Sequence, residues 1–247
     1  MARDIILRHI YGINTGIATQ DVDFAVAVRG WDEFESVKKK LIASGQFKAS
    51  DKVEHLVYYK TQEGSNSYPI DIIPFGGVEK PPHTLQWLTD KAVMNLMGYE
   101  EALTTAIPVT IEPGLTVPIV SMPGLALLKL FAWQDRHNLN SKDARDLAIL
   151  FQHYHDAGNQ ERLYASDIDL FEAAEFKIER ASPRLLGKDV RAIAKRETLE
   201  HLMGLLDNPQ QWDRLTTHVA GQIKTAENSI TEAEQLLAQF KAGLTQT

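Results

Sequence analysis

The segment Asp21-Val22-Asp23-Phe24-Ala25-Val26-Ala27-Val28 (DVDFAVAV, residues 21–28) predicts a β-strand that carries two carboxylates. It is rich in residues that favour strands, and residues 31–44 follow it as a predicted helix closed by Gly45. Because successive side chains of a strand alternate between faces, Asp21 and Asp23 share one face and the large apolar residues share the other. The face of the acids continues with small alanines, so we expect it to be apolar or covered beyond the acids.

Two like charges on one face lower stability unless a cation or hydrogen bonds compensate for them, and a divalent metal is the simplest compensation. The charge of Asp71 also needs compensation, because this residue interrupts an apolar strand predicted over residues 68–74. On a strand beside the first, it would complete the oxygen ligands that magnesium (or manganese) prefers. Two ions could then activate an attacking hydroxyl and stabilise a leaving pyrophosphate. The simpler interpretation is that these acids end strands or cap loops.

Strand patterns continue to about residue 121 and helical patterns follow. Residues 2–11 fit a short amphipathic helix that ends at Gly12. Further strands are predicted at residues 57–60, 68–74, 106–111 and 115–120, the last two as a hairpin. Helices are predicted at residues 123–137, 141–155, 167–178, 183–206 and 209–242, with prolines in first turns and Ser141 as an N-cap. We therefore predict an α+β fold, with a mixed αβ domain over residues 1–121 and an all-helical domain over residues 122–247.

Composition limits the function. The chain has no cysteine, which excludes disulfides, thiolate metal sites and a cysteine nucleophile. Its apolar runs are shorter than the roughly 20 residues that cross a bilayer, so we expect a cytoplasmic protein with no membrane contact. The net charge of −7 argues against broad nucleic-acid binding. A local basic groove could draw on one cation-rich stretch of the sequence. The simpler interpretation of this stretch is a solvated helix face. Its cations are Arg180, Arg184, Lys188, Arg191, Lys195 and Arg196.

Several segments resemble one known family. Residues 19–26 (TQDVDFAV) resemble the T-x-D-[IV]-D-F strand of the nucleotidyltransferase superfamily, especially AbiEii-type toxins and related predicted nucleotidyltransferases. Residues 69–76 (PIDIIPFG) are similar to that family's third-acid strand, residues 128–136 (LKLFAWQDR) to its K-x-x-A-x-x-x-R helix, and residues 142–147 (KDARDL) to the start of its next helix. The resemblance covers about residues 1–150 and implies a nucleotidyltransferase-like mixed sheet before the helical domain.

The resemblance also implies roles for individual residues. Asp21, Asp23 and Asp71 would be catalytic metal ligands, with Asp71 as ligand or as base for an acceptor hydroxyl. Lys129 and Arg136 would hold phosphates of the nucleotide, since with Trp133 they lie at i, i+4 and i+7 on one helix face.

Three further residues complete the candidate set. Asp146 would position the lysine or the nucleotide, and Thr19 and Asp143 are further nucleotide-binding candidates. A helix-dipole interaction near Ser141 suffices to explain Asp143, which ranks below Asp146. For Lys129 and Arg136 the simpler interpretation is a pair of solvent-facing cations.

One departure from the family concerns the N-terminus. The superfamily has a first strand and a glycine-rich pair whose backbone cradles phosphates, and both are missing before residues 1–4. Either the true start lies upstream of Met1, which we expect, or the protein binds nucleotide weakly.

These features together predict transfer of a nucleoside monophosphate from a nucleoside triphosphate. The resemblance implies RNA, such as the 3′ end of tRNA, as acceptor, with the basic stretch selecting it, and a cognate antitoxin encoded nearby. Protein hydroxyls and small molecules are the alternative acceptors. The alternative is a nucleotide-binding or protein-interaction module that has lost turnover, against which the three acids argue.

Overall fold

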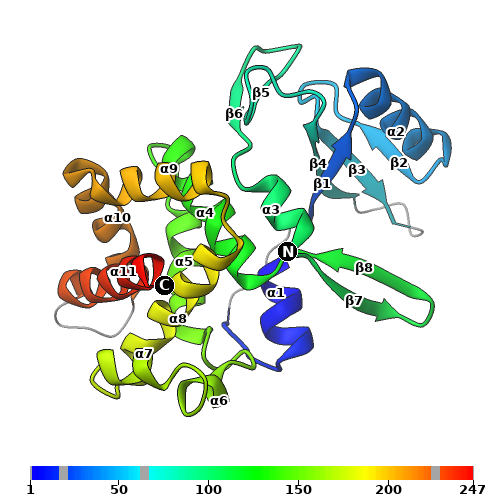
Figure 1. Cartoon of the computed structure of the whole chain (residues 1–247). Helices are drawn as coiled ribbons and strands as arrows, with labels where there is room; N and C mark the ends of the chain where they lie inside the picture. The colour runs from blue at the N-terminus through cyan, green and yellow to red at the C-terminus, as the bar shows by residue number, and fades with distance from the viewer. Residues whose placement is uncertain (1, 17–21, 62–66, 224–228, 247) are drawn as a thin grey trace. The chain divides into compact units, whose positions relative to one another are not determined.

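The computed structural model describes residues 2–16, 22–61, 67–223 and 229–246. They form two compact units, which we call the sheet unit (Gly16–Tyr99) and the helical unit (Ala2–Thr15 with Glu100–Thr247) (Figure 1). The fold is α+β, as predicted. The chain divides at Tyr99 rather than near residue 121, and the N-terminal helix belongs to the helical unit. No helix in the described ranges is both long and apolar enough to span a bilayer.

The sheet unit contains a mixed four-stranded sheet in the order β1-β4-β3-β2. The strands are β1 (Val22–Val28), β2 (Phe47–Ala49), β3 (Leu56–Lys60) and β4 (Ser67–Gly76). β1 and β4 run parallel, whereas β4 with β3 and β3 with β2 run antiparallel. The prediction of β1, β3 and β4 is confirmed. The short strands β2, β5 (Thr84–Gln86) and β6 (Val93–Asn95) were not predicted, because three residues are too few to show an alternating pattern.

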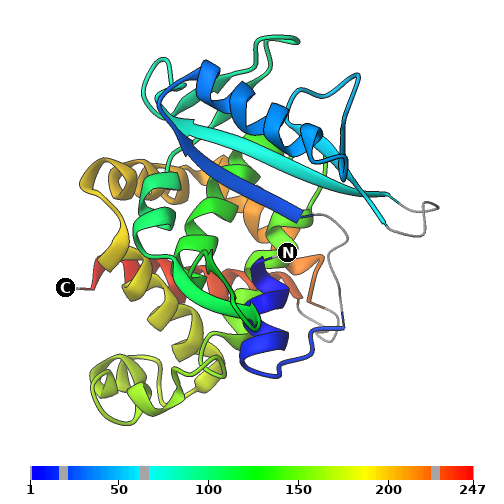
Figure 2. The same cartoon turned by 90° about the vertical axis from the view of Figure 1, so that its right-hand side faces the viewer.

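Helix α2 (Trp31–Ala43) covers one face of this sheet (Figure 2). Its Phe34 is fully buried and contacts Trp31 and Trp87, with ring centroids 5.9 and 6.4 Å apart. The helix ends as predicted, since Gly45 has a φ of +77°. Val28, the last residue of β1, lies in the hydrophobic core under α2. Ala25 and Ala27, which follow Asp23 on its face of β1, are exposed, so of the two expected alternatives this face is apolar and not covered.

A glycine pair closes β1 against β4. Gly76 ends β4 with a φ of +88°, and the Gly77 N–H donates to the Val28 carbonyl at 2.7 Å. A Cβ on Gly77 would lie 2.1 Å from the carbonyl oxygen of Arg29, closer than any side chain permits. Only glycine therefore allows the chain to pass so close to the end of β1.

The helical unit begins with the N-terminal helix. Residues 2–11 are helical as predicted, but only α1 (Ala2–Asp4) is an α-helix; η1 (Ile5–Ile10) winds as a π-helix. Ile6 and Leu7 of η1 are buried, and Gly12 ends the helix with a φ of +69°. The segment is thus an integral part of the core.

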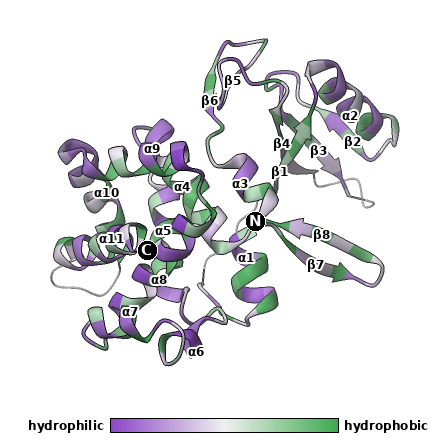
Figure 3. Ribbon diagram, in the orientation of Figure 1, coloured by the Kyte–Doolittle hydropathy of each residue, from purple (hydrophilic) through white to green (hydrophobic). Residues whose placement is uncertain are grey.

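The rest of the helical unit includes α4 (Met122–Arg136), whose many hydrophobic residues are green in the ribbon of Figure 3. The predicted hairpin is present as β7 (Ile107–Glu112) and β8 (Leu115–Ile119). The helices after η1 are α3 (Tyr99–Thr104), α4 (Met122–Arg136), α5 (Lys142–His153), α6 (Gln160–Leu163), α7 (Ile168–Ala173), α8 (Ile178–Ile193), α9 (Arg196–Asp207), α10 (Pro209–Ala220) and α11 (Ser229–Thr245).

Three predicted helices have different bounds. The helix predicted over residues 183–206 is two helices, because the buried Glu101 carboxylate accepts hydrogen bonds from the Lys195 N–H (3.3 Å) and the Thr198 hydroxyl (2.5 Å) and so caps α9. α8 begins at Ile178, which places Pro183 inside the helix instead of in its first turn. The helix predicted over 167–178 is only α7, and that over 209–242 is α10 and α11.

Helices α8 and α11 pack backbone to backbone. A Cβ on Gly187 of α8 would lie 2.1 Å from the carbonyl oxygen of Phe240, and one on Gly243 of α11 would lie 2.0 Å from that of Arg184. Two glycines therefore permit the close contact. α11 thus packs on the core of the helical unit.

Candidate active site

The candidate residues fall into two groups, one in each unit. Asp23 and Asp71 lie in the sheet unit, and Lys129, Arg136, Asp143 and Asp146 lie in the helical unit. Thr19 and Asp21 lie outside the described residues.

Asp23 and Asp71 are direct neighbours in the sheet. They occupy paired positions of the parallel strands β1 and β4. Side chains at paired positions point to the same face, and neighbouring strands lie about 4.8 Å apart. The strand with Asp71 therefore lies beside the strand with Asp23, as expected. Asp23 is exposed and Asp71 is half-buried, so two carboxylates share one accessible face.

The pattern of residues did not reveal His55, which lies next to Asp71. Its Nε2 is 3.7 Å from Asp71 Oδ1, and its ring packs on Trp87 with centroids 4.6 Å apart. The His55 carbonyl also accepts the N–H of Ile72, the residue after Asp71. This contact arises from the pairing of β3 with β4, and single-strand patterns do not show it.

The donor atoms at this face fit a hard divalent cation. Carboxylate oxygens are ligands that magnesium accepts, and one or two protein carboxylates suffice when substrate phosphates supply other ligands. Asp23 and Asp71 provide this set. Among the residues that the structure describes, no group of three or more acids or histidines is close enough to hold a metal ion by itself. Two carboxylates on one accessible face therefore fit such a cation.

In the helical unit, Lys129 and Arg136 of α4 meet two acids of α5. Lys129 Nζ lies 3.1 Å from Asp143 Oδ1 and 2.7 Å from Asp146 Oδ2. Arg136 donates from Nε and Nη2 to the two oxygens of Asp143, at 2.7 and 2.8 Å. Both cations thus converge on one carboxylate, which joins the end of α4 to the start of α5.

Trp133 lies between these cations in the sequence, but it does not join them at the surface. Its side chain is fully buried and donates from Nε1 to Nδ1 of His218 at 3.0 Å.

The contacts of Asp143 differ from expectation. Asp143 is only 1% exposed and holds both Lys129 and Arg136, so a helix-dipole interaction does not suffice to explain it. Ser141 stands at the N-cap position, but its side chain makes no capping hydrogen bond. Asp146 does contact Lys129, as the resemblance implied.

Neighbouring charges determine the protonation states of Asp143 and Lys129. Burial would raise the pKa of Asp143, but the hydrogen bonds and charges of Arg136 and Lys129 outweigh burial and hold that pKa below 3.8. Burial would lower the pKa of Lys129, but Asp146 and Asp143 hold that pKa above 10.5. The ammonium and the carboxylate are both charged near neutral pH.

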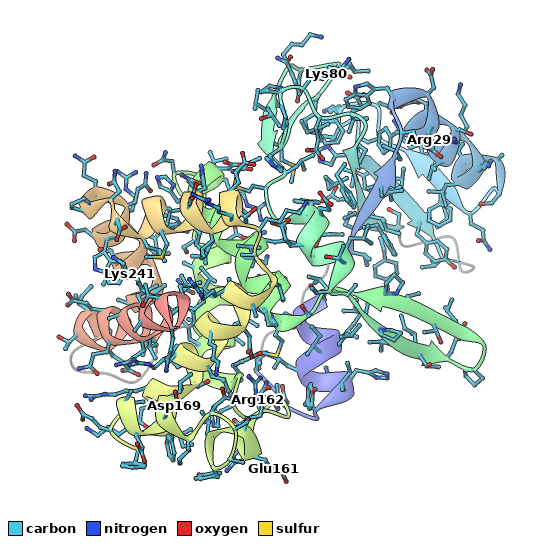
Figure 4. All side chains as sticks on the ribbon, in the orientation of Figure 1. Arg29, Lys80, Glu161, Arg162, Asp169 and Lys241 are labelled. Carbon is cyan, nitrogen blue, oxygen red and sulfur yellow. The ribbon has the colours of Figure 1, made fainter. Side chains whose placement is uncertain are left out.

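The basic stretch of residues 180–196 does not form a basic groove in the structure, and it is not a simple solvated face either. Arg184 donates to the side chains of Gln239 in α11 and of Gln246 after it, and Arg191 donates to the Leu244 carbonyl of α11. Lys188 pairs with Asp167, which also binds Arg162, the α6 residue labelled in Figure 4. The other three cations pair with acids at 2.5 to 2.8 Å: Arg180 with Glu175, Lys195 with Glu100 and Arg196 with Glu200.

Comparison with known proteins identifies the family. The model of the family described as nucleotidyl transferase AbiEii toxin, type IV toxin–antitoxin system, matches residues 18–233. A search of curated proteins found no matching sequence. The matched region contains both acid-bearing strands and the helices α4 and α5, which confirms the resemblance seen in the sequence. The chain therefore belongs to the family of AbiEii nucleotidyl transferase toxins of type IV toxin–antitoxin systems.

Proposed function

We propose that the protein transfers a nucleoside monophosphate from a nucleoside triphosphate to an acceptor hydroxyl, with magnesium or manganese held by Asp23 and Asp71. Family membership makes the chain a nucleotidyltransferase toxin. The metal and the acceptor are our proposal. The observation that carries it is the pairing of the two carboxylates at one register position of β1 and β4.

The chemistry is an in-line displacement. The acceptor oxygen forms a bond to the α-phosphorus while the bond from that phosphorus to the bridging oxygen of the β-phosphate breaks, and pyrophosphate leaves. The hydroxyl proton passes to Asp71 or to water. A divalent ion at Asp23 and Asp71 would neutralise charge on the phosphoryl oxygens and increase the acidity of the hydroxyl.

In the helical unit we propose Lys129 as the phosphate-binding residue. An ammonium has three donors, and two of them are directed to Asp143 and Asp146. The acids hold the lysine in one place and leave a donor for a phosphate oxygen. Arg136 is more exposed and adds positive charge beside it.

RNA, including the 3′ end of tRNA, is the acceptor we propose, together with a cognate antitoxin for the toxin. Both rest on the family. The basic stretch on α8 and α9 gives no support to the choice of RNA, because each of its six cations is bonded within the chain.

The test is an assay of label transfer. The purified protein is incubated with magnesium, each α-labelled triphosphate in turn, and total RNA or tRNA. Asp23→Asn and Asp71→Asn remove one carboxylate each with little change in volume. Asp51→Asn, at an exposed acid of the same unit, is the matched control.

We expect labelled RNA with the native protein and with Asp51→Asn, and a large loss with the other two variants. Transfer that persists in Asp23→Asn and Asp71→Asn would contradict the proposed site. Triphosphate binding without any labelled product from the native protein would favour the module that has lost turnover.

A further inference from the structure

Arg3 is a buried arginine in the N-terminal helix. Its side chain is only 3% exposed, and burying a guanidinium lowers stability unless carboxylates pair with it. Nε and Nη2 donate to Oδ1 of the adjacent Asp4, at 2.9 and 2.6 Å. Nη1 donates to Oδ1 of Asp146 on α5. The second contact joins two distant parts of the chain, so α1 is tied to the helix that carries the candidate site.

Asp146 connects Arg3 to Lys129. Its Oδ1 accepts from Arg3, and its Oδ2 lies 2.7 Å from Lys129 Nζ. Each cation thus has its own carboxylate oxygen. Beyond Lys129 the series continues through Asp143 to Arg136, so cations and carboxylates alternate across five side chains.

Arg3 changes the charge balance around Lys129. With Asp4, the connected side chains carry three positive and three negative charges, and without Arg3 they would carry a net charge of −1. Asp146 would then have Lys129 as its only cation in this series. Since opposite charges attract more strongly in a poorly hydrated site, the ammonium would be drawn toward Asp146 and away from a phosphate.

The helix that carries Arg3 is itself fixed. Ile6 and Leu7 of the following π-helix are each 1% exposed, and α1 contacts α4. A side chain on a well-packed element holds its partners in place at low entropic cost. The family match begins at residue 18, so it does not include Arg3.

We propose that Arg3 is a positioning residue for Lys129. By occupying one oxygen of Asp146, it orients the other oxygen toward Lys129 and leaves the ammonium able to bind a phosphate of the nucleotide. This role rests on the proposed function of Lys129.

The test uses Arg3→Met, which removes the charge at similar length, and Arg3→Lys, which restores it. Arg8→Met is the matched control, because Arg8 is an exposed arginine of the same helical segment. In the transfer assay we expect Arg3→Met to lower kcat/KM for the triphosphate about tenfold or more, since small misplacements of a positioning group have effects of that size. Arg3→Lys should recover most of the loss, and Arg8→Met should stay within about twofold of the native protein.

A second readout does not depend on activity. The pH dependence of chemical methylation at Lys129, followed by mass spectrometry of its peptide, reports the pKa of that amine. We expect the pKa of Lys129 to be higher in Arg3→Met than in the native protein and unchanged in Arg8→Met. If Arg3→Met does not fold, Arg3→Gln keeps an N–H donor for Asp146 and should show the same rise.

The outcomes separate the two proposals. A native protein that transfers no label contradicts the proposed function, whereas the methylation profile still decides whether Arg3 acts on Lys129. Unchanged methylation in folded Arg3→Met or Arg3→Gln would overturn the positioning role. An unchanged kcat/KM for an active Arg3→Met would overturn it as well.

Discussion

Replacing Asp143 by asparagine removes the carboxylate that joins Lys129 to Arg136 and keeps the side-chain volume nearly the same. Removing one partner of a buried ion pair lowers the free energy of unfolding by about 3–5 kcal/mol. Two features reduce this effect: Lys129 keeps Asp146, and Arg136 is 46% exposed and can be hydrated. We therefore expect a loss of about 2–3 kcal/mol at pH 7.

Urea denaturation followed by circular dichroism at 222 nm measures this loss, since most of the helices belong to the helical unit. Glu33→Gln is the control, because Glu33 of α2 forms a surface ion pair with the exposed Arg29, which lies before the helix, and surface pairs contribute little. Its denaturation midpoint should not shift measurably. A loss below about 1 kcal/mol in Asp143→Asn would show that the acid does not join the two helices.

The pH dependence gives a second test of the same interaction. The folded pKa of Asp143 lies below its ordinary value, so its contribution is present above the unfolded pKa and is lost as the pH falls through the folded pKa. The difference in free energy of unfolding between the native protein and Asp143→Asn should therefore be constant from pH 5 to 8. This range lies between the ordinary pKa values of Asp and Lys, about 3.9 and 10.4. The difference should shrink in acid. A difference that persists at pH 2 would refute the electrostatic origin.

Two further predictions concern the helical unit. Gly187→Ala should lower the free energy of unfolding by about 1–3 kcal/mol or more, because its Cβ would meet the Phe240 carbonyl. Gly204→Ala should raise it by about 0.5–1 kcal/mol, because Gly204 of α9 has open space around its Cβ position. Urea denaturation measures both changes. Burial, His137 and Arg214 lower the pKa of His218, so stability should fall as the pH drops below 6.5 and Trp133 loses its acceptor. His218→Asn should weaken this dependence, which burial of His155 also contributes to, and a dependence unchanged in His218→Asn would contradict the role of His218.

The sequence allowed prediction of the features that local patterns encode. Alternation in β1 and an acid within the apolar strand β4 predicted that Asp23 and Asp71 share one site, and the parallel register places them side by side. The spacing of Lys129 and Arg136 predicted a shared face, and both reach the same carboxylate.

Long-range contacts explain most of what was not predicted. Glu101 caps α9 from 94 residues away, so the break between α8 and α9 has no local signal. Arg3 reaches Asp146 across 143 residues. The contact of Asp143 with Arg136 was not predicted, because it depends on how the loop after α4 turns and no local pattern shows this.

The proposed function requires Asp23 and Asp71 to hold the catalytic metal together, and titration with manganese measures this binding. Free Mn²⁺ is followed by electron paramagnetic resonance, in the presence of a non-hydrolysable triphosphate, for the native protein and for Asp23→Asn, Asp71→Asn and Asp51→Asn. We expect each of the first two substitutions to weaken binding about tenfold or more, as loss of a charged ligand does, and Asp51→Asn to leave it unchanged. Equal binding by all four proteins would contradict the claim and would place the metal elsewhere.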